Sequence, residues 1–307
     1  MVGTMERAFR KAIRHNVIVI GRQILCPICQ SLVNKNGEIA ALNSFFAQLK
    51  KLETKPPSLS VPSVLGEIGI FKMDISLEAH RTHSRTVWFL DNFAKGAEIS
   101  DITILVTHEL IEPTATTLID KKISFFQAKI DKKNQNDVFD IPLRQWHLMR
   151  YFPVFRYGGD LFDLSSCRMV PDVCSYYMLL FGKKRFNNVI YGTPISDRYS
   201  CNINSVCASA PNMERWMPEL RGITDKELIA DSSINLTYSE QGDRFFALLW
   251  FLLSTHLGAH EPKGIRLFKA MFADTSEDDD PTHINDSEPR PAIGLRIRVG
   301  LRSEGYG

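Results

Sequence analysis

The sequence has no run of apolar residues long enough to cross a bilayer. Its best candidate, FFALLWFLL at 245–253, is followed by Ser, Thr and His, whereas a spanning helix needs about 20 apolar residues. We therefore expect a buried core helix at about 240–256 and no contact with membranes. A small-residue cleavage site after a secretory-type apolar segment is also missing, so we expect a cytoplasmic protein.

The sequence also lacks the signatures of several enzyme classes. It contains no Gly-rich phosphate loop, no nucleophile elbow and no kinase signature. It has no repeat with a period of about 20 to 50 residues, which argues against solenoids and propellers. With 307 residues, 44% of them hydrophobic and 23% charged, the chain has the composition of one large globular domain or two ordinary ones.

An excess of one charge is missing from the chain as a whole. The net charge of +2 is too small to indicate nucleic-acid binding by itself. The distribution is uneven, because residues 121–190 hold twelve Lys or Arg and six Asp, whereas residues 274–288 hold seven acidic residues and no Lys or Arg. We expect a mobile acidic tail, followed by an edge strand in AIGLRIRVGL at 292–301.

Cysteine is scarce, with six residues in the chain. In a cytoplasmic protein this number favours reduced thiols or a metal site over disulfides. Cys26 and Cys29, in CPIC, have the spacing of a zinc knuckle, but a structural Zn²⁺ site needs two more ligands. Two buried thiols are the alternative. The candidates for the missing ligands are His80 and His83 on a predicted helix, or Cys201 and Cys207.

Apolar periodicity and turn residues predict an α/β core. Residues 5–24 are expected to form a helix that passes into the β-branched run VIVIGRQIL. A helix is predicted at about 39–52, and its apolar stripe comprises Ala40, Leu42, Phe45, Phe46 and Leu49. Another helix is predicted at about 77–95, with Val87, Leu90 and Phe93 facing inward and Gly96 at its end. Strands are predicted at 99–106 and 123–130, joined by the turn IEPTATT. A helix at 140–152 and a strand at 187–195 follow.

Polar side chains interrupt two of the predicted strands at matching depth. Gln127 and Lys129 are two residues apart and share one strand face, and Asp101 interrupts ISDITILV three residues after Glu98. If the strands are neighbours, Asp101, Gln127 and Lys129 converge. Asp101 and Gln127 could then hold Mg²⁺ or Mn²⁺, while Lys129 serves the attacking water or the transition state. Glu98 would assist. The alternatives are a strand-end cap and a solvent-facing edge strand.

Basic residues surround this predicted site. They could contact a nucleic-acid backbone, or they could simply form a solvated surface. The set comprises Lys121, Lys122, Lys132, Lys133 and Arg144.

The motifs ISDITILV and FFQAK resemble the PD-(D/E)xK nuclease superfamily, in the branch whose last motif reads Gln-x-Lys. Within it, they are similar to the nuclease domains of bacterial antiviral effectors. Glu98, Asp101, Gln127 and Lys129 carry the resemblance, and the helix containing Gln145, followed by YFPVF, resembles the segment after the core motif. The resemblance covers residues 85–157. It implies a restriction-endonuclease-like core with a mixed central sheet flanked by helices. It also implies Mg²⁺-dependent cleavage of DNA with little sequence preference, and inhibition of this activity by a partner or ligand.

These observations predict a metal-dependent DNA endonuclease that is the effector of an anti-phage defence complex. A regulatory ATPase or sensor subunit is the expected partner, within an oligomer or hetero-complex. Two alternatives stay open: a stand-alone restriction endonuclease, and a non-catalytic adaptor with a degenerate nuclease fold. The second alternative arises because Gln127 stands where the family has its usual second acid. The expected organisation is an N-terminal helical and strand region with the candidate knuckle (1–84), the nuclease core (85–157), an α-rich C-terminal part (158–273), and the tail with its final strand (274–307).

Overall fold

The structure is a computed structural model of the whole chain. The residues that it describes are 9, 12–13, 15–32, 35, 37–56, 58–61, 70–83, 86–90, 96–130, 138–165, 175–180, 189–192, 201–202, 205–209, 262–272 and 291–304. Lys132, Lys133, the helix expected at 240–256 and the acidic segment 274–288 lie outside the described residues.

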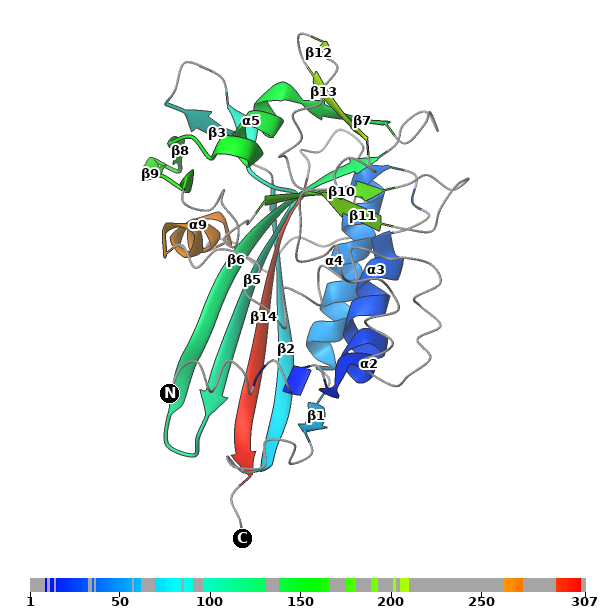
Figure 1. The fold of residues 1–307 in the computed structure, drawn as a ribbon, viewed down its shortest axis with the longest axis vertical. Coiled ribbons are helices and arrows are strands. Elements are labelled where there is room, and N and C mark those ends of the chain that lie inside the picture. The colour runs from blue at the N-terminus through cyan, green and yellow to red at the C-terminus, as the bar shows by residue number, and fades with distance from the viewer. Residues whose placement is uncertain are drawn as a thin grey trace.

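A seven-stranded mixed sheet forms the centre of the fold (Figure 1). Its strand order is β1-β2-β14-β5-β6-β10-β11. β14 runs parallel to β5 and β10 runs parallel to β6, while the other neighbours are antiparallel. This arrangement confirms the predicted α/β class with a mixed sheet flanked by helices. The strands are β1 (Ser58–Val61), β2 (Ile70–His83), β5 (Ile102–Ile111), β6 (Thr116–Ile130), β10 (Ser175–Leu180), β11 (Val189–Gly192) and β14 (Pro291–Glu304).

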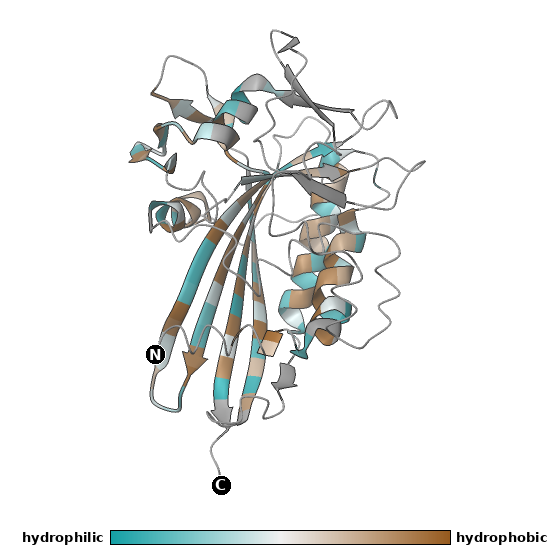
Figure 2. Ribbon diagram, in the orientation of Figure 1, coloured by the Kyte–Doolittle hydropathy of each residue, from teal (hydrophilic) through white to brown (hydrophobic). Residues whose placement is uncertain are grey.

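One face of the sheet is covered by the N-terminal helices (Figure 1). These are α2 (Val17–Ile20), a π-helical turn η1 (Gly21–Leu25), α3 (Cys26–Leu32) and α4 (Glu38–Thr54). Every second residue of the long strands faces these helices, as the alternating colours in Figure 2 show. Burial of these alternate apolar side chains gives the larger of the two cores. On β2 and β14 they are Phe71, Met73, Ile75, Leu77, Ala79, Ile293, Leu295, Ile297, Val299 and Leu301.

The opposite face carries α5 (Leu143–Tyr151) and α9 (Pro262–Phe272). A second core forms here, with Leu105, Phe125, Leu148 and Leu267 among its members. A four-stranded sheet contributes to it, in the order β4 (Ala97–Glu98), β3 (Thr86–Phe89), β8 (Phe155–Tyr157) and β9 (Asp160–Phe162). A separate three-stranded sheet has the order β12 (Cys201–Asn202), β13 (Ser205–Ser209) and β7 (Val138–Pro142).

The local elements around the predicted site match the expectation. The helix predicted at 39–52 is α4, and the helix predicted at 140–152 is α5. The two predicted strands are β5 and β6, joined through residues 112–115 and paired antiparallel. The strand expected at 187–195 is β11. These elements have strong local signals: helical apolar spacing, a Pro at a helix start, and a turn between two β-rich runs.

The helix predicted at 77–95 is wrong, because residues 77–83 belong to β2 and residues 86–89 form β3. The alternation of apolar and polar residues from 71 to 79 has the period of a strand, and that period decides the structure. Val87 is buried as expected, but Leu90 is 50% exposed; Phe93 lies outside the described residues. Gly96 lies directly before β4, and a Cβ at this position would clash with the carbonyl oxygen of Val87, so a glycine allows the chain to pass close to β3.

At the ends of the chain, one prediction is confirmed and one is wrong. The described part of the helix expected at 5–24 is helical, and it continues through the β-branched run VIVIGRQIL into α3, with Ile20, Ile24 and Ile28 buried at a spacing of four residues; burial against the sheet overrides the β-propensity of the run. The final strand, β14, is central rather than at an edge, because it pairs with β2 on one side and β5 on the other. Alternation in a sequence identifies the two faces of a strand, but it does not give its position in the sheet.

The four predicted segments all contribute to the central sheet. β2 comes from residues 1–84, β5 and β6 from 85–157, β10 and β11 from 158–273, and β14 from 274–307. The α-rich part expected at 158–273 stays a prediction, because most of these residues lie outside the part of the chain that the structure describes; its described portion holds the helix α9 and several short strands.

Candidate active site

Asp101 lies directly before β5 and is held by both neighbouring strands. Its backbone N–H donates to the carbonyl of Phe126 on β6 at 2.8 Å, and its carbonyl accepts from the N–H of Ile293 on β14 at 2.9 Å. The side chain turns toward β6, where Oδ2 accepts a 2.7 Å hydrogen bond from the backbone N–H of Ala128. With 1% exposure, the carboxyl group is fixed in a buried position.

The electrostatic environment of Asp101 is unusual for a carboxyl group. Burial raises its pKa from 3.8 to about 7, although Lys129 and the Ala128 N–H act in the opposite direction. Glu38 and Glu98 raise the pKa further. Oδ1, the second carboxyl oxygen, is buried and has no hydrogen-bond partner among the described residues. A buried acceptor in this state is costly unless a proton or a cation satisfies it.

Gln127 belongs to a chain of amide hydrogen bonds beside Asp101. Its Nε2 donates to the backbone carbonyl of Glu98 at 3.0 Å, and its Oε1 accepts from Nε2 of Gln145 at 2.6 Å. The carbonyl of Glu98 can only accept, which fixes the orientation of the Gln127 amide and then that of Gln145. Oε1 of Gln145 takes no part in this chain of hydrogen bonds, and it is buried with no partner in the part of the protein that the structure describes.

Lys129 and Glu98 complete the predicted set. Lys129 lies on the same face of β6 as Gln127 and is 4% exposed. Its positive charge is the second-largest influence on the pKa of Asp101 and lowers it. Glu98 ends β4, is partly buried, and reaches the site through both its backbone carbonyl and its charge. The structure thus brings together Asp101, Gln127, Lys129 and Glu98.

Two further residues belong to this site. Gln145 is on α5, and Glu38 is the first residue of α4, a helix on the other face of the sheet. The resemblance had pointed to the helix of Gln145 without assigning the residue a role. Sequence reasoning missed Glu38 altogether, because an acid in the first turn of a helix is common and needs no functional explanation.

The predicted nucleic-acid contacts separate into three groups. Lys122 is buried, with 2% exposure, and forms a 2.8 Å ion pair with Asp120, so it cannot face a phosphate and we withdraw it from the set. Lys121 is partly buried and Arg144 is exposed, and both stay predictions. Lys132 and Lys133 lie outside the described residues.

The structure does not assemble the predicted zinc knuckle from the residues that it describes. Cys26 and Cys29 are buried within α3 rather than in a turn. His80 lies on β2, not on a helix, and packs against Phe268 and Phe272 of α9 on the far side of the sheet. Among the described residues, no group of three or more His, Cys, Asp or Glu could hold a metal ion. At Asp101, the nearby oxygens of the hydrogen-bond network belong instead to glutamine amides.

Comparison with protein-family models, with curated proteins and with solved structures finds no match for this chain. No helix among the described residues has both the length and the apolar character needed to span a membrane.

Proposed function

We propose that this chain is a divalent-metal-dependent endonuclease that hydrolyses phosphodiester bonds in DNA. One observation carries the proposal: a buried aspartate, Asp101, is hydrogen-bonded to the backbone of the adjacent strand between Gln127 and Lys129, and one of its oxygens has no partner. A carboxylate, amide oxygens and an ammonium group gathered at one point suit phosphodiester chemistry.

The order of elements supports a restriction-endonuclease-like core. α4, β2, β5, β6, α5 and β10 occur in this order along the chain, separated in places by the short strands β1, β3, β4, β7, β8 and β9, with Asp101 before β5 and the Gln-x-Lys motif on β6. β10 returns parallel to β6 after α5. β14 is inserted between β2 and β5 of this proposed core.

The residues at the site fit a hard divalent cation such as Mg²⁺ or Mn²⁺. Asp101 Oδ1 and Gln145 Oε1 are both buried oxygens to which no described residue donates a hydrogen bond, and such cations prefer oxygen ligands. Gln127 was the predicted ligand, but its own Oε1 already accepts from Gln145. We therefore assign the amide ligand to Gln145, with Gln127 as the residue that positions it and Glu98 as an assisting acid. A bound metal ion would polarise the phosphate and lower the pKa of a bound water molecule.

The protein's own groups supply the remaining chemistry. Lys129 places a positive charge beside Asp101, where it would stabilise the charge that develops on the phosphate or orient the attacking water. With its pKa near 7, Asp101 is only partly ionised at neutral pH in the absence of a cation. Binding of a cation favours the ionised form, so metal affinity should rise with pH.

The biological setting is proposed from the sequence resemblance. We propose that the chain is the effector of a bacterial anti-phage defence complex in the cytoplasm. The activity of a nuclease that can damage its host's DNA must be inhibited until it is needed. An ATPase or sensor subunit in the same complex would provide this inhibition.

A non-catalytic, nucleic-acid-binding adaptor is the second candidate. It is favoured by the hydrogen bond that occupies the Gln127 oxygen and by the amide that replaces a second acid at this position. Such a site would have low negative charge and would bind cations weakly.

Incubation of the purified protein with supercoiled plasmid and Mg²⁺ or Mn²⁺ tests the proposal. We expect cleavage by the wild type, a loss of about 100-fold or more in rate for Asp101→Asn and Lys129→Ala, and no loss for Asp160→Asn, an exposed acid on β9. Fragments of many sizes would support the proposal of a defence effector. A few defined fragments would instead indicate a stand-alone restriction enzyme. An intact plasmid with either metal, and with the partner present, would contradict nuclease activity and leave the adaptor.

A further inference from the structure

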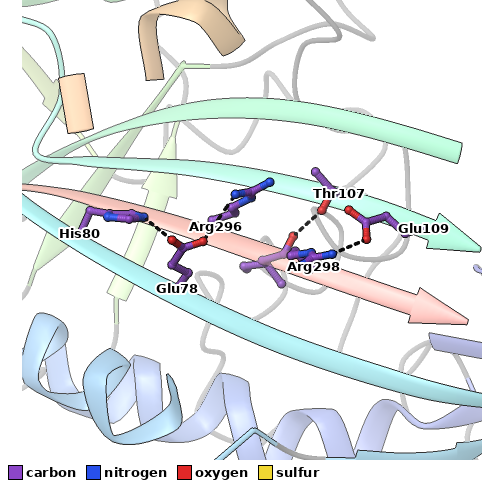
Figure 3. A network of polar contacts seen from close by, with 7 residues as sticks. Glu78, His80, Thr107, Glu109, Arg296 and Arg298 are labelled. Atoms are coloured by element: carbon purple, nitrogen blue, oxygen red, sulfur yellow. Dashed lines mark hydrogen bonds and ion pairs between the residues drawn. The ribbon is translucent and has the colours of Figure 1, made fainter. Parts of the chain in front are cut away.

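A large part of the sheet face that carries Gln127 and Lys129 is not covered by α9. Below this helix, the four adjacent strands β2, β14, β5 and β6 continue (Figure 1). Figure 3 shows charged side chains on β2, β14 and β5. We call this the charged face. Its residues are Lys72, Asp74 and Glu78 of β2, Arg296, Arg298 and Arg302 of β14, Glu109 of β5, Lys121 of β6, and Lys269 at the edge of α9.

The strand register places two cations of the charged face in one row. Arg298 pairs with Thr107 across the parallel strands, and Thr107 pairs with Lys121 across the antiparallel ones. The guanidinium of Arg298 and the ammonium of Lys121 therefore lie two strands apart, roughly 10 Å. Thr107 between them is buried and donates its hydroxyl to the carbonyl of Ile297.

Among the side chains of this face that the structure describes, positive charge exceeds negative charge. Six basic residues face three acidic ones, which leaves a formal charge of +3 (six minus three). Each acid is already paired with an arginine: Glu78 with Arg296 at 3.5 Å, Glu109 with Arg298 at 2.8 Å and Asp74 with Arg302 at 3.6 Å. No such pair involves the ammonium groups of Lys121 and Lys269 among the described residues.

Two observations indicate that the charged face suits an anion. Among the described residues, the Nε of Arg296 is a buried donor without an acceptor, which is costly in a folded protein. The pKa of Lys121 is lowered by partial burial and then by the neighbouring charges of Lys269 and Arg296. Cations from β6, β14 and α9 are thus gathered where they repel one another, and a bound polyanion would relieve this repulsion.

We infer that the charged face binds the phosphate backbone of duplex DNA. The four strands give it a width of about 14 Å, and its described residues include no exposed aromatic side chain on which unpaired bases could stack. Contacts to phosphates alone carry no sequence information.

The inference rests on the proposed nuclease function, because it extends the substrate path from that site. Lys121 and Gln127 are six residues apart on the same face of β6, which corresponds to about 20 Å or roughly six base pairs. Lys269, exposed on the helix that crosses the sheet between them, lies along this path.

Binding of a duplex longer than two helical turns, in the presence of EDTA, tests this inference apart from cleavage. The variant Lys121→Gln/Lys269→Gln/Arg302→Gln removes three charges and keeps the Arg298–Glu109 pair. The matched control Arg22→Gln/Lys51→Gln/Lys55→Gln removes three exposed charges from the helical layer. Fluorescence anisotropy at several salt concentrations gives the affinity and the salt dependence, and circular dichroism checks that both variants fold.

For the charged-face variant we expect an affinity at least tenfold lower. Its slope of log K against log salt should be shallower by about 2 to 3, since each phosphate contact contributes about 0.9. The control should bind like the wild type. Equal affinity and slope for the charged-face variant and the wild type, an equal loss in the control, or tighter binding of a single strand than of the duplex would overturn the inference. Plasmid cleavage, assayed separately, reports on the nuclease proposal alone.

Discussion

The amide of Gln145 on α5 donates a 2.6 Å hydrogen bond to the side-chain oxygen of Gln127 on β6. This contact connects the helix to the strand that carries the Gln-x-Lys motif, and it decides which amide oxygen is available for a cation. Gln127 uses its Nε2 on the carbonyl of Glu98, so each of the two glutamines has a separate task. Gln127 connects β6 to α5 and to the carbonyl of Glu98, and Gln145 has a side-chain oxygen that could bind a cation.

Replacement of Gln145 should therefore have two measurable effects. Gln145→Ala leaves Oε1 of Gln127 buried without its donor, which should lower the free energy of unfolding by about 1–3 kcal/mol. It should also weaken the stabilisation produced by Mg²⁺ or Mn²⁺, since an oxygen ligand is lost. Urea unfolding with and without the cation measures both. Gln30→Ala, at an exposed position of α3, should leave both unchanged; an equal cation effect in Gln145→Ala and the wild type would remove Gln145 from the metal site.

A buried ion pair on the helix-covered face gives a second prediction. Lys122 and Asp120 lie 2.8 Å apart with exposures of 2% and 8%, and His108 lies 3.6 Å from the same Asp120 oxygen. Asp120→Ala removes this carboxylate from a buried ammonium, so we expect a loss of about 3–5 kcal/mol in unfolding free energy. Glu53→Ala, which breaks the more exposed Lys50–Glu53 pair, should cost less than about 1 kcal/mol. Similar losses in the two variants would show that Lys122 does not depend on Asp120.

The sequence predicts the site better than it predicts the sheet. Asp101, Gln127 and Lys129 come together because β5 and β6 are consecutive in the chain and joined by a short turn, so proximity follows from local structure. The position of β14 depends on pairing across about 190 residues, for instance Val106 with Ile297, and no local pattern encodes such a partner.

The error at 77–95 has a different cause. Val87, Leu90 and Phe93 fit a helical spacing, but the preceding residues 71–79 alternate with a period of two, and this pattern is the stronger of the two. The role of Glu38 could not be predicted at all. Its effect on Asp101 arises because α4 begins beside the site in three dimensions, from the other face of the sheet.

The packing of α9 on the sheet depends on a glycine. A Cβ on Gly294 would lie 2.8 Å from the ring of Phe272, so Gly294→Ala should push the helix away and lower the free energy of unfolding by about 1–3 kcal/mol. Phe272→Leu, which is smaller at the contact, should restore part of this loss in the double variant. A double-mutant cycle by chemical denaturation measures the coupling. Strict additivity of the two changes would contradict direct packing of Phe272 on β14.

The raised pKa of Asp101 predicts how stability depends on pH. An acid whose pKa is about 7 in the folded state and 3.8 in the unfolded state binds more protons when folded throughout that interval. The free energy of unfolding should therefore fall as the pH rises from about 4 to about 7, by at most about 4 kcal/mol for this group. Mg²⁺ or Mn²⁺ should recover part of this loss near neutral pH, since the cation stabilises the ionised carboxylate.

Asp101→Asn isolates this effect from the other titrating groups. Its side-chain oxygen can still accept from the Ala128 N–H, but it has no charge to bury, so the decrease in stability between about pH 4 and about pH 7 should be smaller and the response to the cation should disappear. Asp160→Asn, the exposed control, should follow the wild type at every pH. Parallel stability curves for Asp101→Asn and the wild type, with the same response to the cation, would mean that this carboxyl group ionises without cost and that the divalent ion binds elsewhere. The proposed active site would then lose its central ligand.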